Sequence, residues 1–216
     1  MDLLLFDLDG TLVDSRKDIA NAVNAVLRRR GYEEIEFDFI VGSIGQGVTH
    51  LLRRCLEHLR IPAEELKAVK AAFMEEYREN LVVETTMYPG VPETLEGLSD
   101  CRKAIITNKP HALAVSLLEQ LGLAEHFALV LGGDSVRHKK PAPDALIQAM
   151  QHFTADQRST MMIGDSIYDL EAARAAGVRS VAALYGFQKE TLLRSEGADY
   201  YIHNFPALAG IIGVAA

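Results

Sequence analysis

Two aspartates stand two positions apart near the start of the chain, directly after a run of apolar residues. Asp7 and Asp9 follow Leu3-Leu4-Leu5-Phe6 and precede Gly10 and Thr11. Residues i and i+2 of an extended chain share one face, so both carboxylates can reach one pocket. Carboxylates this close repel each other unless they share a cation or a proton. The pair therefore predicts either a solvated strand end or acid chemistry around a cation.

A second pair of acids follows another apolar run. Asp165 comes after Met161-Met162-Ile163-Gly164, and Asp169 stands four positions later, one turn into a predicted helix. Side chains four positions apart on a helix are neighbours, so both carboxylates can point toward one hard cation. Mg²⁺ suits such a site, because it is held by a few carboxylates, water and substrate phosphate.

Two further predicted strand ends carry polar groups that a core does not need. Thr107 and Asn108 end one strand before a helix, where hydroxyl, amide and backbone N–H groups can bind a phosphate-sized anion, although such residues are also common in loops. Lys140 precedes Pro141, which favours an extended backbone there. A lysine held in this way can neutralise a carboxylate and an anionic ligand together. Lys139 is the competing candidate for this role.

The elements that must position these groups are short apolar strands alternating with helices. Strands are predicted at residues 3–7, 102–108, 127–131, 160–165, 180–184 and 200–202, and helices at 112–121, 142–153 and 168–176. This rhythm predicts an α/β fold with a doubly wound parallel sheet covered by helices on both faces. Ligands of such sheets bind beyond the carboxyl ends of the strands. The four polar strand ends should therefore meet at one site.

The segment from residue 15 to residue 84 breaks the rhythm and has the pattern of helices only. Apolar side chains repeat there at helical spacing, as in Ile19, Val23, Val26 and Leu27. A helical block inserted after the first strand is most simply a separate cap. We therefore expect a core domain of residues 1–14 and 85–216, and a helical-bundle domain of residues 15–84.

Composition limits the partners of this 216-residue chain. Its net charge of −8 argues against nucleic acid, because phosphate backbones are bound by basic surfaces. No apolar run approaches the ~20 residues of a membrane span, and no secretory signal is apparent. Cys55 and Cys101 are expected to be reduced thiols. These features predict a cytoplasmic protein, a monomer or weak homodimer, that binds neither nucleic acid nor membrane.

A charge count suggests how the acids divide their work. The four aspartates bring −4, while Mg²⁺ and Lys140 return +3, which leaves −1. Protonating Asp9 makes the site neutral before an anionic phosphate arrives. One carboxylate can then act as a nucleophile while another carries a proton.

Together these residues resemble the haloacid dehalogenase superfamily of phosphatases, whose C1-type cap is inserted where the helical block lies. The superfamily's four motifs match in order with Asp7-Leu8-Asp9-Gly10-Thr11-Leu12-Val13, Ile106-Thr107-Asn108, Lys140-Pro141 and Gly164-Asp165 through Asp169. The loop Val41-Gly42-Ser43-Ile44-Gly45-Gln46-Gly47-Val48 is similar to the cap loop of its phosphoglycolate phosphatase group, and Thr107-Asn108-Lys109-Pro110 fits that group too. The resemblance implies a Rossmann-like core with a helical cap.

The same resemblance implies a Mg²⁺-dependent phosphomonoester hydrolase for a small phosphorylated metabolite, with 2-phosphoglycolate as the best candidate. Asp7 would attack phosphorus and become an aspartyl phosphate, and Asp9 would protonate the leaving alcohol and then deprotonate water. Lys140 would stabilise Asp7 and the transferring group.

Binding roles follow from the resemblance as well. Mg²⁺ would be held by the Asp7 side chain, the Asp9 backbone carbonyl and Asp165, with Asp169 linked through water. Thr107 and Asn108 would hold the phosphoryl oxygens. Specificity would reside in the cap loop at residues 42–47, with contacts from Gly45 and Gln46.

Other functions share part of this pattern. A β-phosphoglucomutase-like phosphotransferase would have the same core residues and differ in its cap, and a pyrophosphatase or nucleotidase of the same superfamily would differ in substrate. A non-enzymatic phosphoacceptor also uses acids, Thr and Lys around Mg²⁺. It is disfavoured because it would be near half this length and uncapped.

Overall fold

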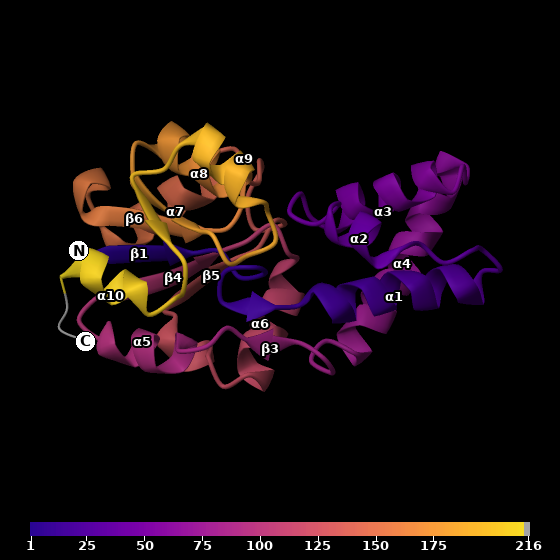
Figure 1. Ribbon diagram of the computed structural model, residues 1–216, viewed down its shortest axis with the longest axis horizontal. Coiled ribbons are helices and arrows are strands. Elements are labelled where there is room, and N and C mark those ends of the chain that lie inside the picture. Colours follow the sequence, from indigo (N-terminus) through magenta and orange to yellow (C-terminus); the bar gives the residue numbers. More distant parts are fainter. Residues whose placement is uncertain (214–216) are drawn as a thin grey trace. The chain divides into compact units, whose positions relative to one another are not determined.

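The chain divides into two compact units in the computed structural model, which describes residues 1–213 (Figure 1). One unit comprises Met1–Asp14 and the chain from Met87 onward, and the other comprises Ser15–Thr86. Two short strands, β2 (Val13–Asp14) and β3 (Thr86–Met87), lie where the chain passes from one unit to the other.

The first unit, which we call the core unit, contains a parallel sheet of six strands within the described residues. Its order is β5-β4-β1-β6-β7-β8, and every neighbouring pair is parallel. The strands are β1 (Leu3–Phe6), β4 (Arg102–Ile106), β5 (Leu129–Leu131), β6 (Thr160–Gly164), β7 (Arg179–Ala183) and β8 (Tyr200–Ile202). The predicted α/β class with a parallel sheet is confirmed.

Helices cover both faces of this sheet, which explains the apolar runs in its central strands. On one face Leu3 and Leu5 of β1 pack with apolar residues of α7 (Asp144–Phe153) and α8 (Ile167–Ala176). On the other face the ring of Phe6 contacts Phe127 and Phe205, with centroid distances of 5.9 and 6.0 Å. The remaining helices of the unit are α5 (Val91–Gly97), α6 (His111–Gln120), α9 (Glu190–Glu196) and α10 (Ala207–Ile212).

The strands that carry the predicted polar residues end earlier than the sequence pattern indicated. β1 ends at Phe6, β4 at Ile106 and β6 at Gly164. Asp7, Thr107, Asn108 and Asp165 therefore lie just beyond the strand ends, although the N–H groups of Asp7 and Thr107 still donate to the carbonyl oxygens of Ile163 and Leu131, at 2.9 and 3.0 Å.

The second unit, which we call the helical unit, is built from four helices: α1 (Arg16–Arg29), α2 (Phe37–Val41), α3 (Val48–His58) and α4 (Leu66–Glu79). Its apolar stripes are buried, as expected for core positions, with Val23, Leu52 and Phe73 each about 1% exposed. The buried carboxylate of Asp18 accepts hydrogen bonds from the backbone N–H groups of Val83, Glu84 and Thr85 and from the Thr85 hydroxyl, at 2.7–3.0 Å. Asp18 thus fixes the end of the unit's chain to its first helix.

Within residues 1–213, no helix has both the length and the apolar character that crossing a membrane requires.

Candidate active site

The predicted catalytic residues of the core unit follow three neighbouring strands of the sheet. Asp7 comes after β1, Asn108 after β4 and Asp165 after β6, and β1 lies between the other two. The connections from β4 and β6 leave this position in opposite directions along the sheet. Such a switch point is where ligands bind in open α/β folds.

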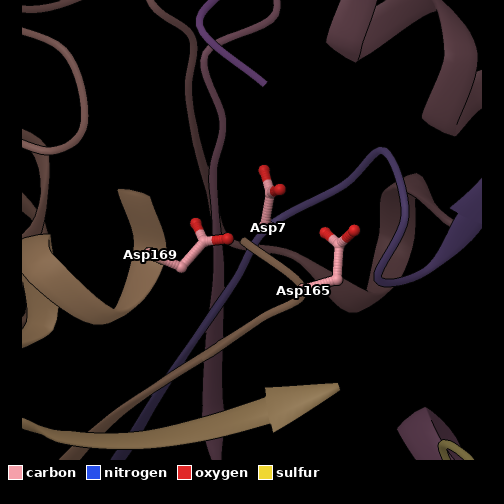
Figure 2. Close-up of side chains that lie close together, drawn as sticks. All are labelled: Asp7, Asp165 and Asp169. Carbon is pink, nitrogen blue, oxygen red and sulfur yellow. The ribbon is translucent and has the colours of Figure 1, made fainter. Parts of the chain in front are cut away.

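Three buried carboxylates meet at this position (Figure 2). Asp7, Asp165 and Asp169 each offer an oxygen, and these oxygens lie within 4.8 Å of one another. Asp169 reaches the cluster from the first turn of α8, where the N–H and hydroxyl of Ser166 donate to its Oδ2 at 3.0 and 2.6 Å. This capping box both starts the helix and fixes the rotamer of the acid.

Lys140 is the lysine buried among these acids. Its Nζ lies 2.8 Å from Asp7 Oδ1 and 2.6 Å from Asp169 Oδ1, and it donates to the carbonyl oxygen of Ile106 at 2.5 Å. The side-chain amide of Asn108 donates to the Lys140 carbonyl oxygen at 2.9 Å, which joins the segment after β4 to the lysine. One ammonium group thus touches two of the three acids.

Burial makes this cluster electrostatically costly without a further positive charge. Burial raises the pKa of Asp7 to about 7; Asp169 and Asp9 add to the rise, while Lys140 opposes it. Burial likewise raises the pKa of Asp165 well above its usual value, with repulsion from Asp7 and Asp169 adding to it. Burial lowers the pKa of Lys140, but Asp169 and Asp7 outweigh this effect and the net shift is upward. The donor set of three carboxylates around one ammonium fits a hard divalent cation.

Asp9 has a different partner. Both of its carboxylate oxygens accept from Nζ of Lys109, at 2.9 and 3.2 Å, and the side chains of Lys109 and Asp9 are only 3% and 12% exposed. The sequence placed Lys109 in a family motif but gave it no role. The charge count made from the sequence omitted it. With Lys109 included, two lysines and a divalent cation balance all four aspartates.

A backbone N–H and a side-chain hydroxyl fix Asp165 from two sides. Its Oδ2 accepts from the N–H of Phe187 at 2.7 Å, and its Oδ1 accepts from the Thr11 hydroxyl at 3.2 Å. A Cβ placed on Gly10 would lie 2.2 Å from Asp165 Oδ2, and one on Gly186 would lie 2.2 Å from Asp165 Cβ. The segment after β7 is therefore part of the site, although its contribution is an N–H group and the absence of a side chain.

The remaining predicted residues fall into two groups. In the core unit, Thr107 Oγ1 accepts from the N–H of Lys109 at 3.1 Å, so the loop after β4 folds back on itself beside the acids. Gly45 and Gln46 belong to the helical unit, in the loop between α2 and α3, where Gly45 has a φ of 117°. The predicted site residues of the core unit thus lie near Asp7, whereas Gly45 and Gln46 belong to the helical unit.

Comparison with known proteins agrees with the fold. The sequence model of the haloacid dehalogenase-like hydrolase family matches residues 4–183 of this chain. A phosphoglycolate phosphatase of Chromobacterium violaceum is 38% identical over 208 residues, covering 94% of this chain and 92% of that protein. One from Aquifex aeolicus is 38% identical over 202 residues, covering 93% and 91%. The crystal structure of a predicted phosphoglycolate phosphatase from Haemophilus somnus has a TM-score of 0.94 and 30% identity, and the match covers 98% of each chain.

These matches confirm the resemblance drawn from the sequence. The core unit has the Rossmann-like α/β fold of a class of hydrolases. The chain belongs to the haloacid dehalogenase-like hydrolase family.

Proposed function

We propose that this protein is a Mg²⁺-dependent phosphomonoester hydrolase that works through an aspartyl phosphate on Asp7, with 2-phosphoglycolate as its substrate. The observation that carries the proposal is the cluster of three buried carboxylates within 4.8 Å of one another, with Lys140 in contact with two of them. The substrate is suggested by the names of the relatives, which are phosphoglycolate phosphatases over nearly the whole chain.

The metal would be held by the side chains of Asp7 and Asp165 and by the backbone carbonyl of Asp9. Asp169 already has one oxygen on Lys140 and the other on Ser166, so it would contact the metal through water. When bound, Mg²⁺ would neutralise negative charge on the phosphoryl group and on the acids that face it.

In the first step an oxygen of Asp7 attacks phosphorus and the bond between phosphorus and the ester oxygen breaks. For this step Asp9 must be protonated; it gives that proton to the ester oxygen, so the alcohol leaves neutral, and it regains a proton in the second step. In the second step water attacks the phosphorus of the aspartyl phosphate, and Asp9 takes a proton from this water. Inorganic phosphate leaves and Asp7 is again a carboxylate.

Lys140 and the loop after β4 would stabilise the charge that develops on the phosphoryl oxygens. The ammonium of Lys140 is already 2.8 Å from the nucleophile, so it needs no rearrangement to act. The Thr107 hydroxyl and the Asn108 amide would contact the phosphoryl group directly. Gly45 and Gln46 of the helical unit would contribute to substrate selection.

The setting in the cell belongs to the proposal too. Both cysteines, Cys55 and Cys101, are buried free thiols, which suits a reducing compartment such as the cytoplasm. We propose a monomer or weak homodimer there, acting on a free small metabolite.

The test is a screen of phosphate release from phosphorylated acids, sugars, nucleotides and pyrophosphate, each with Mg²⁺ and with EDTA. The proposal predicts the highest kcat/KM with 2-phosphoglycolate and loss of turnover with EDTA. A chain that releases no phosphate from any monoester, or that works equally well in EDTA, would contradict it.

A further inference from the structure

The ion pair between Lys109 and Asp9 carries a consequence for substrate choice. We propose that Lys109 recognises a carboxylate on the leaving group and thereby selects phosphorylated hydroxy acids among phosphate monoesters. This inference rests on the proposed function, in which Asp9 exchanges a proton with the leaving oxygen.

The geometry places Lys109 on the leaving-group side of the reaction. Asp9 must contact the ester oxygen in order to protonate it. In 2-phosphoglycolate the carboxylate carbon is two bonds from that oxygen, so its oxygens lie about 3 Å away. Lys109 Nζ is 2.9 Å from Asp9 Oδ1 and 3.2 Å from Oδ2. An ammonium so close to the proton donor is within reach of a carboxylate attached to the leaving oxygen.

The two buried lysines of the site contact different acids. Lys140 donates to Asp7, Asp169 and the Ile106 carbonyl, which places it beside the nucleophile. Lys109 donates to Asp9. A substrate that carries both a phosphate and a carboxylate would thus meet one lysine at each end.

The main chain of Lys109 is fixed on both sides. Its N–H donates to Thr107 Oγ1 at 3.1 Å, and its carbonyl oxygen accepts from the N–H of Gly133 at 2.9 Å. A Cβ on Gly133 would lie 2.7 Å from the carbonyl oxygen of Asn108, so glycine lets these segments approach. Because the side chain is also held by Asp9, Lys109 is prepositioned, and little side-chain freedom remains to be lost on binding.

Charge and burial make this lysine a selective group. With 3% of its side chain exposed, Lys109 interacts with anions under little solvent screening. An ammonium has three N–H donors, so one group can serve two carboxylates. A hydrogen bond to a charged group in such a place changes binding by roughly 10- to 100-fold. A monoester that lacks the carboxylate would forgo this factor.

The experiment compares 2-phosphoglycolate with ethyl phosphate, in which a methyl group replaces the carboxylate. We expect Lys109→Met to lower the ratio of their kcat/KM values by roughly 10- to 100-fold, chiefly through KM for 2-phosphoglycolate. Lys109→Arg, which keeps the charge, should restore part of the ratio. Lys67→Met, at an exposed position on α4, is the control and should leave the ratio unchanged.

The outcomes separate this inference from the proposed function. If Lys109→Met lowers kcat/KM equally for both substrates, Lys109 acts only through Asp9 and carboxylate recognition is wrong, while the hydrolase remains. If the unaltered protein hydrolyses neither substrate, the proposed function itself fails.

A second measurement needs no variant and so does not depend on how the variants fold. The unaltered protein should prefer 2-phosphoglycolate to its carboxyl methyl ester by roughly 10-fold or more, because the ester has no charge for Lys109 to meet. Equal kcat/KM values for the acid and the ester would overturn the inference.

Discussion

Lys140 Nζ lies 2.8 Å from Asp7 Oδ1 in a place almost closed to solvent, with side-chain exposures of 3% and 12%. The same ammonium touches Asp169, so one positive charge holds two acids that would otherwise repel each other. This ion pair links stability and catalysis. The Lys140 ammonium reduces the repulsion between the buried acids, and it also contacts the Asp7 oxygen that is proposed to attack phosphorus.

Replacing this lysine should therefore damage both properties. Lys140→Met is expected to lower kcat by about 100-fold or more, as for loss of one preorganised charge at a transition state. It should also lower the free energy of unfolding by about 3 kcal/mol in EDTA, because two buried carboxylates lose their partner. Steady-state kinetics and denaturant unfolding measure the two effects. Lys139→Met is the matched control; if it were the damaging variant, the assignment of Lys140 would be wrong.

The shifted acids predict how metal-free stability depends on pH. Burial raises the pKa of Asp7 to about 7 in the folded chain, from the 3.8 of an unperturbed aspartate. Between about pH 4 and 7 the folded chain therefore holds the extra proton, and raising the pH over this range lowers the free energy of unfolding. Asp165 is shifted in the same direction. Thermal unfolding in EDTA should show this fall, and Asp7→Asn should reduce it. An Asp7→Asn variant with the same pH dependence as the unaltered protein would contradict this prediction.

Metal binding should remove this pH dependence of the free energy of unfolding, because the cation replaces the protons on the buried carboxylates. Since Mg²⁺ requires ionised carboxylates, its binding at pH 6 should release protons. Calorimetry in two buffers with different ionisation enthalpies counts them. Binding that releases no protons at pH 6 would show that the acids are already ionised without metal.

The glycine beside Asp165 provides a test of positioning that removes no functional group. Gly186→Ala would place a Cβ 2.2 Å from Asp165 Cβ, so the acid or the segment after β7 must shift. We expect at least a 10-fold weaker Mg²⁺ affinity, measured by calorimetry on the substrate-free protein. Gly97→Ala, where the structure has open space around the new methyl group, should bind Mg²⁺ normally. Equal affinities for the two variants would mean that the position of Asp165 does not depend on Gly186.

Asp18 allows the helical unit to be tested without altering the acids. Asp18→Ala removes the acceptor of every hydrogen bond from residues 83–85 described above, including those of the buried Thr85. A loss of about 2–4 kcal/mol in the free energy of unfolding is expected. Asp18→Asn should lose less, since one oxygen remains. Faster amide exchange at residues 83–85 in Asp18→Ala would locate the effect, whereas unchanged exchange there would contradict it.

The sequence predicted the fold class because β1 is wholly apolar and β4 and β6 each contain an uninterrupted apolar run, a pattern that parallel sheets buried on both faces produce. It also pointed to the convergence of Asp7, Asn108, Lys140 and Asp165, since the carboxyl ends of parallel strands meet at one edge. Helices α5, α9 and α10 were not predicted. They have only six or seven residues each, too few to display a helical repeat.

Other parts of the site could not be obtained from the sequence. Asp7 and Asp9 were expected to use one face of an extended strand, but β1 ends at Phe6. The carboxylate of Asp9 pairs with Lys109, while Asp7 joins Asp165 and Asp169. The hydrogen bond from the Phe187 backbone to Asp165 depends on tertiary approach and has no side-chain signature.

If Asp7 takes the phosphoryl group, that group can be trapped on its carboxylate. Enzyme mixed with 2-phosphoglycolate and Mg²⁺ is quenched in acid within milliseconds, digested, and examined by mass spectrometry. We predict one phosphoryl group on the peptide that contains Asp7, and none on the same peptide from Asp7→Asn, which should fold but not turn over. A phosphoryl group found on another residue, or an Asp7→Asn variant that hydrolyses the substrate at a near-normal rate, would rule out Asp7 as the nucleophile.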